Sequence, residues 1–280
     1  KFMMSVLATG LTVPAALSLA KRAEAATPKS GGLFRMGIAH GSTTDTLDSA
    51  TSENHFTLVN GYTFGNNLTE VNNDGQLIGE LAESYESSDG QTWVFNLRQG
   101  VEFHNGKSLT SEDVVDSLNH HLGEDSKSAA KGQLGAVTSV KADGKYGVVV
   151  ELSGGDADFP FILTDYHILI CPSNGDGTVD WQSGTGTGGF SLVEHEPGVR
   201  TLTKANPNYW KPNRRFFDEV ETLQIADSAA RANALRTGEL DAKNNVAPKT
   251  ADLLKRQSGI VVDVTKGNKQ VTLPMLTNIA

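Results

Sequence analysis

The segment from residue 92 to residue 122 constrains the fold most, because its apolar residues change from the two-residue period of a strand to the period of a helix. Alternate apolar positions predict strand segments as far as residue 103, and they are Trp93, Phe95, Leu97, Val101 and Phe103. Asn105-Gly106 follows as a turn, since these residue types accept a left-handed backbone. A helical pattern then begins, so the segment predicts a strand pair that leads into a helix.

The start of this helix is indicated by its capping residues. Thr110 is predicted as the N-cap, and Asp113 is predicted as its partner in an approximate capping box. Leu109 is expected to contact Val114 across the first turn. The predicted buried stripe consists of Val114, Val115, Leu118 and Leu122. These residues therefore belong to the scaffold of the protein.

Two glycine motifs resemble nucleotide-binding loops but lack the required spacing or context. Gly100 and Gly106 enclose five residues, whereas a phosphate loop has about four at this point. GTGTGG at 184–189 has no strand before it and no helix after it, because the strand-like FSLVEHE follows directly. We therefore predict a flexible hinge or turn at 184–189 and no nucleotide site.

Length and charge limit the class of protein. A chain of 280 residues can form one large domain or two ordinary ones. The net charge is −9, and without the first 25 residues (Lys1, Lys21 and Arg22 against Glu24, a net +2) it is −9 − 2 = −11. A nucleic acid or other polyanion is therefore not expected as a partner.

The first 25 residues have the pattern of an export signal. Residues 2–20 are almost free of charge, and Ala23-Glu24-Ala25 forms a small-x-small cleavage site. We expect a signal peptide at 1–25, and a twin-arginine region before it remains open. Cys171, the single cysteine, can neither form an internal disulfide nor anchor a lipid at the mature N-terminus. An unanchored periplasmic protein is the expectation.

The remaining elements alternate along the chain. Further strands are predicted at 33–39, on both sides of the turn 142–144, and at 190–196, 221–226, 260–264 and 271–280. Further helices are predicted at 55–68, 229–237 and 251–258, the second capped by Asp227 or Ser228 and ended by Gly238. Residues 69–90 are rich in turn formers, and no strand is predicted there.

The sequence contains no recognisable catalytic motif. It lacks the G-x-S-x-G elbow of serine hydrolases, and His195-Glu196 is followed by residues that supply no second zinc ligand. His120 and His121 are adjacent, so their rings would point about 100° apart on a helix. We predict no catalytic residue, metal ligand or cofactor. Paired carboxylates remain open as glycosidase groups, because their distance is set by the fold.

Three stretches together resemble one family, the extracytoplasmic solute-binding proteins of ABC importers in the dipeptide, oligopeptide and nickel class. They are LTEVNNDGQLIGELAESYESSDGQTWVFNLRQGVEFHNGKSLTSEDVVDSL (68–118), GTGTGGFSLVEHEPGVRTLTKANPNYWKP (184–212) and the helix end RTGELDA (236–242). One departure is Gly189, where the family usually has proline. The stretches are long and in the order of the family's own motifs.

The resemblance implies a mixed α/β fold of the periplasmic binding protein type, with two lobes, of which this chain covers mainly the first. It implies a first lobe from residues 26–63 and 179–269, an inserted subdomain at 64–178, and a crossover strand at 270–280 toward a second lobe. Such a protein acts as a monomer, closes around a solute and delivers it to a permease in the inner membrane.

The resemblance also predicts which residues face the ligand: Thr51, Ser52, Glu53, Asn54, Asp165, Tyr166 and His167. As alternatives, Glu53 and Asn54 cap the following helix, and Tyr166 and His167 pack beneath the subdomain. A small peptide suits these side chains, while an opine, a sugar, nickel or haem remains open as the ligand. A secreted hydrolase of peptides or glycosides, and a sensor that has lost transport, are the other functions considered.

Overall fold

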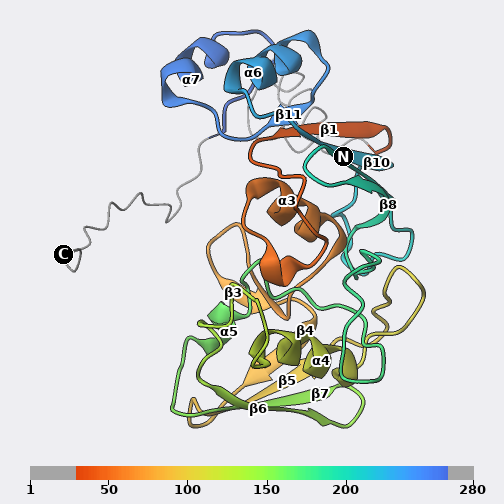
Figure 1. The fold of residues 1–280 in the computed structure, drawn as a ribbon, viewed down its shortest axis with the longest axis vertical. Coiled ribbons are helices and arrows are strands. Elements are labelled where there is room, and N and C mark those ends of the chain that lie inside the picture. The colour runs from red at the N-terminus through yellow and green to blue at the C-terminus, as the bar shows by residue number, and fades with distance from the viewer. Residues whose placement is uncertain (1–29, 264–280) are drawn as a thin grey trace, which may run out of the picture. The chain divides into compact units, whose positions relative to one another are not determined.

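The computed structural model describes residues 30–263, which fall into two compact units with a boundary after Asn244. The first unit contains two larger sheets and a small strand pair (Figure 1). The second unit contains α7 (Pro248–Lys255), which confirms the last predicted helix and begins three residues earlier, with Pro248 in its first turn. Within the described residues, no helix is both long and apolar enough to cross a bilayer.

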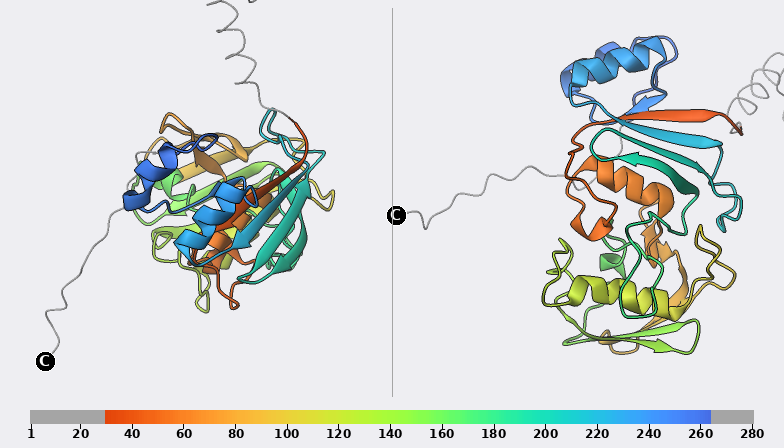
Figure 2. Two further views of the ribbon diagram at one scale, coloured as in Figure 1. Left: turned by 90° about the horizontal axis from the view of Figure 1, so that it is seen from above. Right: turned by 45° about the vertical axis from the view of Figure 1, so that its right-hand side comes forward.

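A five-stranded sheet is built from segments far apart in the sequence. Its order is β11 (Ala242–Lys243), β1 (Leu33–Ile38), β10 (Glu219–Gln224), β9 (Arg200–Ala205) and β8 (Phe190–Glu196). β1 runs parallel to both of its neighbours, and β10, β9 and β8 are antiparallel. The helices α3 (His55–Phe64) and α6 (Ser228–Thr237) lie on opposite faces of this sheet (Figures 1 and 2).

Capping residues define α6 as predicted. The Asp227 carboxylate accepts the Ala230 N–H at 2.7 Å, so Asp227 is the N-cap. Gly238 ends the helix with a φ of 78°, a left-handed conformation that glycine adopts without strain.

A four-stranded antiparallel sheet and one helix form the second layered part of this unit. Its order is β4 (Ala82–Glu86), β5 (Thr92–Leu97), β7 (Gly147–Leu152) and β6 (Val137–Asp143), with α4 (Ser111–Leu122) on one face (Figure 1). The residues of the predicted alternating set, Trp93, Phe95, Leu97, Val101 and Phe103, are all buried in one core. Val114 and Leu118 are buried beside them, so the strand at 92–97 and the helix after residue 110 are confirmed. The second strand, predicted around Val101 and Phe103, is wrong, because this segment forms turns and only an isolated bridge between Glu102 and Ser108.

The capping box of α4 is also confirmed. The Thr110 N–H and hydroxyl donate to Asp113 Oδ2 at 2.9 and 3.0 Å. Asp113 is fully buried, and its other oxygen accepts the Ser173 N–H at 2.8 Å and pairs with Lys107. The cap therefore also joins the segment after residue 172 to the start of the helix.

Two further sequence predictions are corrected. Residues 69–90 contain three strands, β2 (Thr69–Val71), β3 (Leu77–Gly79) and β4, because backbone pairing across the turn at 72–75 outweighs the polar side chains. Residues 260–263 form no strand, and Val261 is 90% exposed, so this apolar run has no neighbouring strand to pair with. The segments predicted at 1–25 and 271–280 lie outside the described residues.

A buried polar network joins two of the stretches that resemble the family. The Glu80 carboxylate accepts bonds from Lys211 Nζ at 2.5 Å, Asn66 Nδ2 at 2.7 Å and the Asn67 N–H at 2.7 Å. The Lys211 ammonium also lies 5.1 Å from the ring of Trp210. Burial raises the pKa of Glu80, against the opposing effect of the Lys211 charge and its hydrogen bond.

The glycine loop at 184–189 packs closely on the end of α3. A Cβ on Gly188 would lie 2.5 Å from the Phe64 carbonyl carbon, and the Gly188 N–H donates to Phe64 O at 2.9 Å. The Gly186 N–H donates to His104 Nδ1 at 3.2 Å, so His104 carries its hydrogen on Nε2 and donates to Gly188 O at 3.0 Å. The loop is therefore a turn whose glycines are required by close backbone approach.

Replacing Gly188 by alanine is expected to destabilise the protein by about 1–3 kcal/mol, because the added methyl group overlaps Phe64. The measurement is the free energy of unfolding in denaturant. Gly154→Ala is the matched control, since its Cβ would meet nothing within 4 Å. Equal stability of the two variants would contradict the packing described here.

Candidate functional site

The loop before α3 is shaped by two side-chain caps. Asp48 accepts the Ala50 N–H at 3.0 Å and begins a short 3-10 helix, η1 (Ser49–Thr51). Asn54 accepts the N–H groups of Phe56 and Thr57 at 2.9 and 3.1 Å and begins α3. The capping alternative is therefore confirmed for Asn54.

Asn54 has a second fixed partner, since its amide donates to Asp45 Oδ1 at 2.7 Å. The neighbouring predicted residues differ from one another in exposure: Ser52 is buried, whereas Thr51 and Glu53 are exposed. Thr51 and Glu53 are thus the members of this segment that face outward.

The structure brings the two predicted segments together through His167. His167 Nε2 donates to Ser52 O at 2.8 Å, and the Ser49 hydroxyl donates to His167 O at 2.8 Å. On the other side of the ring, Nδ1 lies 2.5 Å from Asp165 Oδ1, which also accepts the His167 N–H at 2.9 Å. His167 is buried, so it joins the segments rather than lining an open surface.

The Asp165 carboxylate is held in its charged form by these contacts. Burial alone would raise its pKa, but the hydrogen bonds from the His167 ring and backbone outweigh burial and lower the pKa overall. Gln133 Nε2 adds a further contact to Oδ2 at 3.3 Å.

Two tyrosines stand beside this carboxylate. The Tyr166 ring lies 3.9 Å from the His167 ring, centroid to centroid, and is only partly buried. Tyr62 of α3 donates to Thr164 O at 3.3 Å, and burial together with the Asp165 charge raises the pKa of Tyr62 to about 12. Both phenols therefore stay protonated at neutral pH and can donate hydrogen bonds.

Two surface hollows flank η1. One, of about 310 Å³, is lined by Ser42, Thr44, Asp45, Thr46, Thr51, Glu53, Asn54 and Thr57. The other, of about 450 Å³, is lined by Asp48, Ala50, Thr51, His120, Trp181 and residues 123–128. Thr51 borders both hollows, and carboxylates occur in both walls. These walls can accept hydrogen bonds or a positive charge from a solute.

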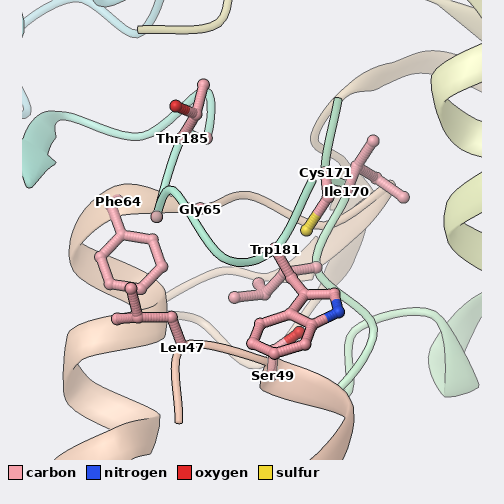
Figure 3. A pocket seen from close by; sticks show the side chains of 11 residues that line it. Leu47, Ser49, Phe64, Gly65, Ile170, Cys171, Trp181 and Thr185 are labelled. Carbon is pink, nitrogen blue, oxygen red and sulfur yellow. The ribbon is translucent and has the colours of Figure 1, made fainter. Parts of the chain in front are cut away.

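A smaller apolar cavity lies behind the loop, between Leu47, Phe64 and Trp181 (Figure 3). Its volume of about 10 Å³ accommodates only a group the size of a water molecule. Cys171 borders it, and burial raises the pKa of this thiol to about 12, so the thiol is not a nucleophile at neutral pH.

The adjacent histidines of α4 have different partners. His120 Nε2 lies 3.1 Å from Asp48 Oδ2, whereas His121 Nδ1 contacts the Ser128 hydroxyl at 2.7 Å. Burial lowers the pKa of His121 to about 4. Within residues 30–263, no group of three or more histidine, cysteine, aspartate or glutamate side chains is arranged to hold a metal ion.

Sequence reasoning missed most of the residues that line the hollows, among them Asp45, Asp48, His120 and Trp181. The position of Asp48, just before a serine and an alanine in a polar loop, was a signal for a cap. Its contact with His120, 72 positions away, could be found only from the fold.

Comparison with known proteins identifies the family. The sequence profile of the bacterial extracellular solute-binding proteins, family 5 (middle), matches residues 76–279. The chain belongs to this family. The resemblance predicted from the three stretches is thus confirmed.

Curated relatives of this family 5 chain include YhjP, an uncharacterized protein of Bacillus subtilis, 32% identical over 57% of the chain and 26% of YhjP. Di/tripeptide-binding protein 1 of Pseudomonas aeruginosa is 26% identical over 70% of the chain and 41% of that protein. The chain therefore spans less than half the length of these relatives.

Solved structures confirm the predicted mixed α/β fold of the periplasmic binding protein type. The family 5 chain matches AgaA of A. tumefaciens, solved with agropinic acid, with a TM-score of 0.74 and 26% identity over 81% of the chain and 46% of AgaA. It matches DppA of Helicobacter pylori with a TM-score of 0.73 over 84% of the chain and 51% of DppA. At 24% identity, the DppA match supports the fold alone.

The Asp165 contacts generate a prediction about pH. Because the pKa of Asp165 is lowered in the folded protein, its contribution is present above the unfolded pKa of about 3.9 and is lost as the pH falls through the folded pKa. Asp165→Asn should therefore cost about 1–2 kcal/mol at neutral pH and less at acidic pH. Denaturant unfolding at several pH values measures this difference, with Glu86→Gln on β4 as an exposed control. A loss that does not change with pH would show that the carboxylate charge is not involved.

Proposed function

We propose that this chain forms the first lobe of a periplasmic solute-binding protein, which captures a small peptide or similar solute and delivers it to an ABC importer. The observation that carries the proposal is that hydrogen bonds join segment 165–167 to loop 49–54, and that residues of this loop line two surface hollows. Sequence relatives carry names that include di/tripeptide-binding, oligopeptide-binding and nickel-binding protein. Family membership supports the capture of a solute and its delivery to an importer. The position of the loop and the hollows supports the place at which the solute binds.

The division into domains is part of this proposal. All strands of the four-stranded sheet lie between residues 82 and 152, within the inserted subdomain proposed at 64–178. All strands of the five-stranded sheet lie in the proposed first-lobe segments, 26–63 and 179–269. Residues 270–280 would then lead toward the second lobe, and closure of the two lobes would exclude water from the solute.

The chemistry of the hollows favours a peptide. An extended peptide presents N–H donors and an ammonium group, and Asp45 and Glu53 offer carboxylate acceptors in one wall. Glu53 is exposed and lines this wall, so its carboxylate can contact a solute. Tyr166 adds an aromatic face on which a side chain can stack.

The proposed function is non-enzymatic, exported and monomeric, with the permease as the protein partner. Export is supported by the signal-like pattern of residues 1–25 and by membership of a family of extracellular solute-binding proteins. A secreted hydrolase and a sensor without transport are kept as outcomes of the experiment.

The test is a thermal-shift screen of the full-length protein with di- to pentapeptides, opines, sugars and Ni²⁺. A solute that binds only the folded state raises the melting temperature, because it stabilises that state by RT ln(1 + [L]/Kd). A rise with one solute class, together with loss of its uptake when the gene is deleted, is the expected result. A rise without loss of uptake would indicate the sensor. Turnover of a peptide or glycoside would contradict the proposal and indicate the hydrolase.

Glu53→Gln should weaken binding of a peptide found in this screen by about tenfold, because the charged acceptor is replaced by a neutral amide of the same shape. Isothermal calorimetry measures the dissociation constant. Glu86→Gln, an exposed carboxylate on β4, should leave it unchanged. Equal affinity of the Glu53 variant and the parent protein would place the ligand elsewhere.

A further inference from the structure

The loop that carries Thr51 and Glu53 has a second attachment, made by a pair of residues that family resemblance did not indicate. Asp48 accepts the Ala50 N–H at 3.0 Å through its side chain and the Thr51 N–H at 3.2 Å through its backbone. Its carboxylate also lies 3.1 and 3.2 Å from His120 Nε2. One residue thus starts η1 and connects it to α4.

His120 is fixed at its own end of this contact. It lies in the last turn of α4, where the negative end of the helix dipole favours a protonated imidazole. α4 is held at its other end by the capping box and along its length by buried Val114 and Leu118. The helix therefore provides a rigid support to which the loop is attached.

We propose that Asp48 and His120 are positioning residues whose ion pair helps to fix the conformation of loop 49–54, and that deprotonation of His120 loosens this loop. Their side chains are 13% and 31% exposed, so the pair is shielded from solvent only in part. Its effect on the loop is therefore moderate and sensitive to salt. The consequence for ligand affinity rests on the proposed function, whereas the effect on the loop does not.

The direction of the pH dependence follows from the state of His120. The hydrogen bond with Asp48 and the Asp48 charge raise its pKa against the opposing effect of burial. A raised pKa means that the pair stabilises the loop fully below about pH 6.5 and loses this effect as the pH rises through the folded pKa. The other titratable or charged groups around the pair and its loop are His121, Glu124, Asp125, Lys127, Asp165, His167 and Cys171.

Hydrogen exchange of the full-length protein tests the proposal without a ligand. After correction for the intrinsic exchange rate, protection of the amides of Ala50, Thr51 and Ser52 should fall about fivefold between about pH 6 and about pH 9. His120→Gln keeps a donor toward Asp48 but does not titrate, so its protection should not change with pH. Asp48→Asn keeps an acceptor for the Ala50 N–H without a charge, and it should likewise remove the change.

His40→Asn is the matched control. His40 is an exposed histidine with a φ of 70°, a conformation that asparagine accepts, so the variant removes a titrating group without disturbing the pair. It should retain the fivefold fall. The proposal is overturned if the parent protein shows no fall, if the fall persists in His120→Gln, or if His40→Asn abolishes it.

A binding measurement with trialanine separates this proposal from the proposed function. If the tripeptide binds, its dissociation constant should rise about fivefold over the same pH range in the parent protein and stay constant in His120→Gln. A constant value in the parent protein would overturn the positioning role. Failure of this and every other solute to bind would contradict the proposed function, while the exchange result would still decide whether the pair fixes the loop.

Discussion

The contact of His167 with Ser52 is the interaction on which the candidate site depends. It connects residues 115 positions apart, and it does so inside the protein, where each polar atom needs a partner. Asp165 orients the ring from one side, and the Ser49 hydroxyl fixes the backbone of His167 from the other. This set of bonds therefore fixes the two segments relative to each other.

The stretches that resemble the family lie far apart in the sequence, and contacts between distant residues hold them together in the fold. Glu80 and Lys211 belong to two of these stretches and form an ion pair within the same network as Asn66. Gly188, from the second stretch, packs against the end of α3. Residues such as Glu80, Lys211 and Gly188 do not contact a ligand hollow, but they are required because they hold one sheet in place relative to the other.

Much of the scaffold could be predicted from local patterns. The change of period around residue 110 gave a correct account of β5 and α4, because burial of one face determines both elements. The strands of residues 69–86 were missed, since their side chains are largely polar and backbone pairing alone forms them. Residues 260–263 illustrate the opposite error, in which an apolar run formed no strand.

The site could be predicted from the sequence less completely than the scaffold. Residue types could suggest a cap at Asn54, and the structure confirms it. The choice between lining a surface and packing inside could not be made for His167, because it depends on a carbonyl group from a distant segment. The pairing of Asp48 with His120 was missed for the same physical reason.

The central claim is that the solvent-accessible parts of segments 51–54 and 165–167, which include Thr51, Glu53 and Tyr166, form one ligand-facing surface on the first lobe. Differential hydrogen exchange of the full-length protein, with and without a solute found to bind, tests it most directly. The account predicts that both segments become protected together when the solute is added. Protection confined to other parts of the lobe, with these two segments unchanged, would contradict it.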